Sequence, residues 1–193
     1  DQKQLISLGR GLVREDVAAI LMDEPLTVID PDLKFRLRRK LKEINAKYKT
    51  TLIYVTHDQN EAMTFADNII VMDEGEVVQA GSPKDLFEKP QTTFVGYFIG
   101  SPAMNLYECK ADNSNQVSLG SNNIAVQTNL GSTNTSNLKL GIRSEYITVE
   151  LTSGPNTIHA DIIEVEDFGN YKLITAQQDL IRIKAKVKRE QEV

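Results

Sequence analysis

Two short apolar runs constrain the fold of this chain most. The first, residues 17–22, leads directly into Asp23 and Glu24, and the second, residues 52–55, leads through one threonine to His57. A continuous apolar run of this length is typical of a β-strand that is covered on both faces in a parallel sheet. We therefore predict two buried strands, each with ionisable side chains close after its C-terminal end.

The segments around these runs alternate between helix and strand patterns. Asp30, followed by proline, predicts a helix start, and apolar residues recur on one stripe of the helix that runs through residues 33–48. Asp58 and Glu61 predict a capping box ahead of a short helix, with no catalytic role. Residues 68–79 predict a β-hairpin. This alternation favours the α/β class.

The composition changes after residue 102. Between residues 111 and 138 the only charged residue is Asp112, and Asn, Ser, Thr and Gly dominate. Short alternating runs separated by turn residues follow, and this pattern predicts a small β-barrel or sandwich. We therefore expect a domain boundary near residue 102, with an α/β part over residues 1–102 and a β-rich part over residues 103–193.

The order of the two strands predicts where their polar ends meet. Sequential strands joined by a helix tend to be neighbours in one sheet, connected by a right-handed crossover. Neighbouring strands lie about 5 Å apart. Asp23 and Glu24 are then expected to converge with His57 at the edge where open α/β sheets bind ligands.

These residue types suit phosphate chemistry. Asp23 can hold a hydrated Mg²⁺, Glu24 can orient or deprotonate a water, and His57 can donate a hydrogen bond to a terminal phosphate. The alternative is that Asp23 and Glu24 belong to a simple turn and His57 to a loop; the matched second strand favours the phosphate interpretation. Asp30 is open to two roles, a helix cap and an inter-subunit contact, which are compatible.

Composition and the absence of certain motifs exclude several functional classes of protein. The net charge of −5 argues against a nucleic-acid binder, and the basic residues of the helix through 33–48 are interpreted as a solvated face. The single cysteine excludes a disulfide framework and fits a reducing compartment. No segment predicts a membrane span or a signal peptide, so we expect a soluble protein. The phosphate-binding loop G-x-x-x-x-G-K-S/T is missing from the sequence.

The residues at the two strand ends, together with their surroundings, resemble a known protein family. Residues 1–105 resemble the later part of the ATPase subunit of an ABC transporter, most closely the importers of the maltose, glycerol-phosphate and polyol type. Asp23 and Glu24 correspond to the Walker B aspartate and the catalytic glutamate, and His57 to the switch histidine. Residues 27–30 occupy the position of the D-loop. The resemblance implies a P-loop NTPase sheet of which this chain holds the C-terminal part.

The resemblance extends to both ends of the chain. Asp1 and Gln2 correspond to the last two positions of the signature L-S-G-G-Q, with Asp1 in place of the final glycine. Residues 94–105 resemble the linker into the accessory domain of this branch. Residues 141–145 resemble the G-I-R-P-E element of its oligonucleotide-binding-like regulatory domain, with Ser144 in place of proline. A truncated N-terminus, with the phosphate loop upstream, is the corresponding expectation.

The resemblance implies cofactors and partners. ATP and Mg²⁺ are expected, with Asp1, Gln2 and Asp30 contributing to nucleotide sites shared with a second copy or a paralogous ATPase subunit. Transmembrane permease subunits are the other expected partners, with no nucleic acid, so that the protein lies in the cytoplasm on the inner face of the membrane. The solute is expected to be a carbohydrate or a glycerol-like polyol. Alone, this chain is expected to be inactive.

Two other functions remain open. One is a non-transport ABC ATPase acting on nucleic acid or ribosomes, because oligonucleotide-binding barrels also bind single strands. Residues 103–193 contain only four aromatic residues, and residues 111–138 contain no Lys or Arg, which disfavours a stacking groove. The other is a regulatory or scaffolding module without catalysis, because the backbone amides and the lysine of a phosphate loop are missing.

Overall fold

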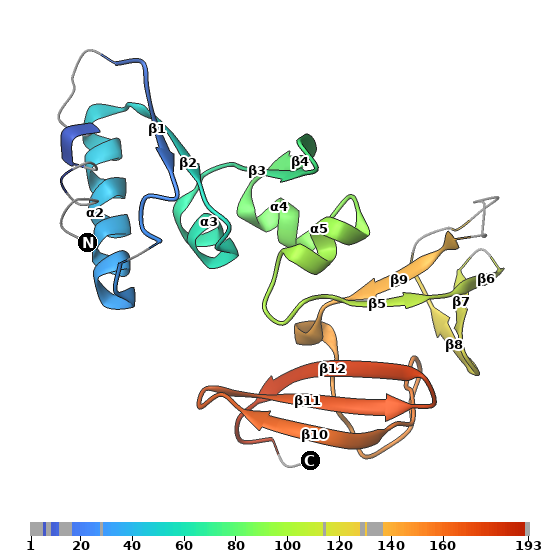
Figure 1. Cartoon of the computed structure of the whole chain (residues 1–193). Helices are drawn as coiled ribbons and strands as arrows, with labels where there is room; N and C mark the ends of the chain where they lie inside the picture. The colour runs from blue at the N-terminus through green and yellow to red at the C-terminus, as the bar shows by residue number, and fades with distance from the viewer. Residues whose placement is uncertain are drawn as a thin grey trace. The chain divides into compact units, whose positions relative to one another are not determined.

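A computed structural model gives the structure of residues 6, 9–11, 17–27, 29–113, 115–127, 130 and 137–191. The chain forms two compact units that divide between Leu86 and Phe87. Figure 1 labels the elements of both. No helix among the residues that the structure describes is long and apolar enough to cross a membrane.

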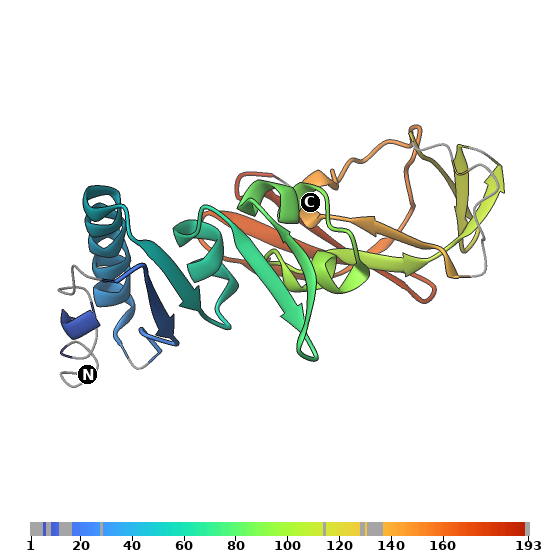
Figure 2. The ribbon, with the colours of Figure 1, turned by 90° about the horizontal axis from the view of Figure 1, so that it is seen from above.

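The first unit is built around a parallel pair of strands. Strands β1 (Ala19–Asp23) and β2 (Thr51–Val55) pair in parallel, from Ala19 opposite Thr51 to Asp23 opposite Val55. Helix α2 (Pro31–Tyr48) connects them and lies alongside the pair in both views (Figures 1 and 2). The prediction that the two strands are neighbours with their C-terminal ends side by side is confirmed.

Only one face of this pair is packed by the described residues. Met22 forms a small core with Leu41 of α2 and Phe65, supported by Ile20, Leu52 and Tyr54. On the opposite face Leu21, Ile53 and Val55 are 68%, 50% and 46% exposed. The expectation of strands covered on both faces is therefore wrong for the described part of the chain. Successive side chains of a strand point to opposite faces, so covering one face leaves every second residue exposed.

The rest of the first unit follows the local sequence signals. Helix α3 (Gln59–Phe65) is followed by the antiparallel strands β3 (Ile69–Asp73) and β4 (Glu76–Gly81), which confirm the predicted hairpin, and by α4 (Pro83–Glu88). The two loop residues of the hairpin, Glu74 and Gly75, have φ values of 48° and 85°. Positive φ at both positions is the requirement of the tight hairpin turn that matches the twist of the strands.

The described residues of the second unit form helix α5 (Thr93–Phe98), a 3₁₀ turn and three separate antiparallel sheets. The sheets are β5 (Asn105–Glu108) with β9 (Lys139–Ile142), then β6 (Lys110–Asn113), β7 (Gln116–Leu119) and β8 (Asn122–Ala125), and finally β10 (Asp161–Asp167), β11 (Tyr171–Gln178) and β12 (Ile181–Lys188). The 3₁₀ turn η2 (Ser144–Tyr146) starts at the fully buried Ser144.

These sheets do not close into the expected barrel within the described residues. The physical reason is visible where β5 meets β12. Asn105 donates its side-chain amide to the carbonyl of Lys184 at 2.9 Å, and its Oδ1 accepts from the Lys184 N–H at 2.8 Å. A side chain therefore occupies the edge of β12 that a neighbouring strand would need for a continuous ladder.

The buried Arg143 connects residues 87–99 to the β-rich part of the chain. It is 2% exposed, and its guanidinium donates to the carbonyls of Phe87 at 2.9 Å, of Gly96 at 3.0 Å and of Ile99. The guanidinium also lies 4.1 Å from the centre of the Phe87 ring. These contacts tie residues 87–99 to the β-rich part, whereas a boundary at residue 102 stays a prediction.

Candidate functional site

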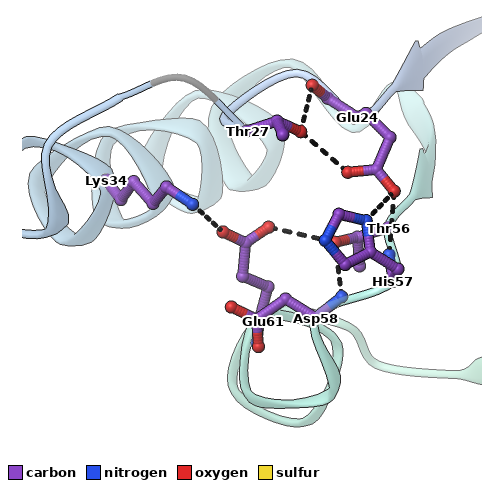
Figure 3. Close-up of a pocket in the computed structure, with 7 residues that line it drawn as sticks. All are labelled: Glu24, Thr27, Lys34, Thr56, His57, Asp58 and Glu61. Atoms are coloured by element: carbon purple, nitrogen blue, oxygen red, sulfur yellow. Dashed lines mark hydrogen bonds and ion pairs between the residues drawn. The ribbon is translucent and has the colours of Figure 1, made fainter.

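The site begins where β1 ends. Glu24 has a φ of 46°, a left-handed conformation that costs a residue with a side chain about 1–3 kcal/mol. Its N–H donates to the carbonyl of Val55 at 3.0 Å and so continues the contact between the two strands by one residue. Thr27 donates its hydroxyl to the Glu24 carbonyl at 3.1 Å and thereby holds the turn that follows. The strained backbone directs the Glu24 side chain toward the end of β2 (Figure 3).

Glu24 and His57 are in direct contact. One carboxylate oxygen, Oε1, accepts the His57 backbone N–H at 2.9 Å and lies 2.6 Å from Nδ1 of the ring. The other, Oε2, accepts the Thr27 hydroxyl at 2.8 Å (Figure 3). An ionised carboxylate only accepts, so this geometry places a proton on Nδ1. The His57 side chain is 75% exposed, which leaves the far side of the ring open to a ligand.

These donors act on the acidity of Glu24. The hydrogen bond from Thr27 is the largest cause of a pKa below the ordinary value of 4.5, and the His57 donors act in the same direction, whereas partial burial opposes them. Glu24 is therefore held as a carboxylate, the form that accepts a proton or orients a water.

A second group of contacts lies on the other side of His57. Glu61 Oε2 accepts from the Tyr54 hydroxyl at 2.8 Å and from the Thr56 hydroxyl at 3.2 Å. Glu61 Oε1 forms ion pairs with Lys34 at 3.4 Å and with Arg38 at 3.3 Å. Burial, and then the bond to Glu61, raise the pKa of the Tyr54 phenol well above its ordinary value, so Tyr54 acts as a donor.

Together these residues line a small pocket of about 60 Å³. Figure 3 shows its lining side chains, which come from the turn after β1, from α2, from the loop between β2 and α3 and from α3 itself. The lining residues are Glu24, Thr27, Lys34, Thr56, His57, Asp58 and Glu61.

The structure brings together two of the predicted site residues. Glu24 and His57 meet as the strand topology predicted, which confirms their convergence. Asp23 ends β1 beside Glu24 and is exposed, but it does not line the pocket. Asp30 caps α2 by accepting the N–H of Asp32 at 3.0 Å, as predicted, and it also lies outside the pocket lining.

Three predicted positions lie outside the described residues. They are Asp1 and Gln2 of the signature match and Val28 of the D-loop match. The described residues contain no group of three or more His, Cys, Asp or Glu side chains arranged to hold a metal. A hydrated Mg²⁺ needs only one or two carboxylates together with phosphate oxygens, and the exposed Asp23 at the strand end fits that demand.

The predicted capping box is only half formed. Asp58 accepts from the N–H groups of Asn60 at 2.8 Å and Glu61 at 3.3 Å, which is the expected cap. The reciprocal bond is different, because the Asp58 N–H donates to the Thr56 hydroxyl at 3.0 Å and the Glu61 carboxylate turns elsewhere. Two residues of the expected solvated face, Lys34 and Arg38, also turn toward Glu61. Lys34 and Arg38 are four residues apart and so lie on one side of α2, which is the sequence pattern that could have indicated a shared partner.

No protein-family model matches the chain, but curated proteins do. It is 40% identical over 171 residues to the oligosaccharides import ATP-binding protein MsmX of Bacillus subtilis, covering 88% of this chain and 44% of that protein. With the xylose/arabinose import ATP-binding protein XacK of Haloferax volcanii the identity is 40% over 177 residues, covering 88% and 44%. With the sn-glycerol-3-phosphate import ATP-binding protein UgpC of Vibrio cholerae it is 34% over 193 residues, covering 96% and 51%.

The chain is a homologue of ABC importer ATP-binding proteins. This confirms the resemblance predicted from residues 1–105 and 141–145. The chain spans about half the length of the curated relatives it matches. The match to the Vibrio cholerae protein over 96% of this chain includes both strand ends and the β-rich part.

Proposed function

We propose that this chain is the part of an ABC importer ATPase that carries out ATP hydrolysis at the ends of β1 and β2. The observation that carries the proposal is the contact of the Glu24 carboxylate with the backbone and ring of His57. We call the protein that joins this chain to a phosphate loop the full-length protein. Its homologues are named as import ATP-binding proteins, which supports transport over other uses of ATP.

Each residue at the strand ends has a proposed role. Glu24, held ionised by Thr27 and His57, accepts the proton of the attacking water or orients it. His57 Nε2, on the exposed side of the ring, contacts the terminal phosphate. Asp23 holds Mg²⁺ through water, and the ion supplies charge neutralisation for the phosphates when it is bound.

The proposed partners involve three further residues, Asp30, Asp1 and Gln2. Asp30 caps α2 and is exposed, which supports a contact with the nucleotide site of a second copy or a paralogous ATPase subunit. Asp1 and Gln2 are proposed for the reciprocal contact from the signature segment. Permease subunits in the membrane complete the proposed assembly, with the ATPase on its cytoplasmic side and without nucleic acid.

The solute and the β-rich part are proposed at a coarser level. The relatives are named for oligosaccharides, xylose and arabinose, and sn-glycerol-3-phosphate, so we propose a carbohydrate or a glycerol-like polyol. Residues 103–193 are proposed as a regulatory domain related to oligonucleotide-binding folds. Because the chain lacks a phosphate loop, we expect no measurable ATPase activity from its 193 residues alone.

The experiment that tests the proposal measures ATP-driven solute uptake in vesicles containing the full-length protein and its permease. His57→Ala is expected to retain ATP binding within about threefold and to lower uptake and ATP turnover by about 100-fold or more, because an interaction with the transferred phosphate is lost. His159→Ala, in the second unit, is the matched control and is expected to leave both unchanged. Normal uptake by His57→Ala contradicts the proposal.

A further inference from the structure

Glu61 is a buried carboxylate whose contacts exceed what its helix requires. It is 3% exposed, and the cap of α3 needs only the carboxylate of Asp58. A buried charge is costly unless it is paired and hydrogen-bonded. The pairing partners of Glu61, Lys34 and Arg38, come from a different helix, and its hydroxyl donors come from β2 and the residue after it.

The contacts of Glu61 form a closed ring with Thr56 and Asp58, the two chain neighbours of His57. The Thr56 hydroxyl donates to Glu61 Oε2, the Asp58 N–H donates to the Thr56 hydroxyl, and the Glu61 N–H donates to the Asp58 carboxylate. His57 is the residue between Thr56 and Asp58, so its two chain neighbours are both members of this ring. On the opposite side its own N–H and ring are held by Glu24.

Helix α2 brings the positive charges to this ring. Lys34 and Arg38 lie one and two turns after Asp30, and the Lys34 N–H donates to the Asp30 carbonyl at 2.8 Å. Both side chains are only about a fifth exposed, at 22% and 20%. The start of α2 is thus connected through Glu61 to the loop that carries His57.

We propose that Glu61 is a positioning residue for His57. It acts through the Thr56 hydroxyl, which fixes the loop between β2 and α3, and its charge is balanced by Lys34 and Arg38 of α2. Glu61 itself contacts none of the reacting atoms. The consequence for ATP turnover rests on the proposed role of His57, whereas the effect on the His57 backbone does not.

The direct test measures amide hydrogen exchange of His57 by NMR in the 193-residue chain. Thr56→Val removes only the hydroxyl, and we expect the His57 amide to exchange about tenfold faster, the effect of losing about one hydrogen bond. Thr56→Ser keeps the hydroxyl and is expected to retain the original rate. Thr92→Val removes a comparable cap, to the Val95 N–H in the second unit, and is expected to leave His57 unchanged.

A second pair of substitutions tests Glu61 itself. Glu61→Leu cannot accept a hydrogen bond and is expected to accelerate exchange at His57 as Thr56→Val does. Glu61→Gln keeps an acceptor oxygen for Thr56 and is expected to restore protection. If Glu61→Leu does not fold, the Thr56 pair still decides. Unchanged exchange at His57 in Thr56→Val overturns the proposal, because the ring then fixes nothing at that residue.

Turnover separates this proposal from the proposed function. In the full-length protein Thr56→Val is expected to lower kcat about tenfold with KM for ATP unchanged, because orientation rather than binding is lost. Faster exchange at His57 with normal kcat supports the positioning role and rejects His57 as a participant in hydrolysis. Lower kcat with unchanged exchange rejects the positioning role.

Discussion

Among the described residues, each unit buries one charged side chain, and the two side chains have different kinds of partners. Glu61 of the first unit is 3% exposed and meets only side chains through its carboxylate: two hydroxyls and two cations. Arg143 of the second unit is 2% exposed, and its guanidinium donates to three main-chain carbonyls. The first arrangement joins side chains from α2, α3 and the end of β2, and the second joins a side chain to the backbone.

The surroundings of Arg143 show how closely the second arrangement is packed. Gly100 has a φ of 117°, and a Cβ there would lie 2.7 Å from Arg143 Nη1. Burial lowers the pKa of Arg143, while Glu145 opposes this effect. Side-chain partners therefore surround the buried carboxylate beside the His57 loop, whereas main-chain partners accompany the connection between residues 87–99 and the β-rich part.

The largest expected effect is on the second unit. Arg143→Met keeps the length of the side chain but leaves three carbonyls without their donor, each at a cost of about 1–3 kcal/mol when buried. We expect the free energy of unfolding of this unit to fall by about 3–5 kcal/mol, measured by urea denaturation and followed at Tyr107 or Tyr171. A loss below about 1 kcal/mol contradicts the conclusion that Arg143 holds residues 87–99 against the β-rich part.

A smaller effect is expected from the matched substitution in the first unit. Glu61→Gln removes the charge but keeps an acceptor, and Lys34 and Arg38 can turn toward water because they are already partly exposed. We expect the free energy of unfolding of the first unit to fall by about 1–2 kcal/mol, measured by urea denaturation and followed at Tyr54. A loss equal to that of Arg143→Met breaks the comparison, because the carboxylate then behaves as a fixed structural anchor.

The smallest effect is on the pH dependence of stability. The pKa of Glu24 is lowered by Thr27 and His57, and that of Asp167 in the second unit by the Gly169 N–H and then Arg189. Each group then stabilises the folded state above its ordinary pKa, of 4.5 and 3.8, and loses that contribution as the pH falls through the lowered value.

Denaturation between pH 3 and 7 measures this dependence. Glu24→Gln and Asp167→Asn are each expected to flatten the acid side of the stability curve slightly, because both carboxylates are partly exposed, at 35% and 46%. An acid side that steepens in either variant has the wrong sign for a lowered pKa and contradicts the hydrogen bonds assigned to that carboxylate.

The features predictable from sequence were those set by local pattern or by strand order. The cap at Asp30, the hairpin turn at Glu74 and Gly75, and the meeting of Glu24 with His57 belong to this group. The last needed only parallel neighbours with matched ends, and the register of β1 and β2 supplied them.

The features missed depend on contacts between distant elements. The capping-box pattern described Asp58 correctly but not Glu61, because the cations that attract its carboxylate lie on α2. Arg143 carries no sequence signal for its three carbonyl partners, which come from residues more than 40 positions earlier in the chain. The prediction of a barrel was wrong for the described residues because alternating apolar residues predict strands and sheets only. Side chains such as Asn105 decide whether the sheets join.

The most direct test of the central claim is ATP turnover by the full-length protein with Glu24→Gln. We expect ATP binding and dimer formation to persist and the turnover rate to fall by about 100-fold or more, because the carboxylate beside His57 no longer accepts a proton. Glu145→Gln, which changes a glutamate of the second unit, is expected to turn over ATP normally. Normal turnover by Glu24→Gln would contradict the assignment of hydrolysis to the two strand ends.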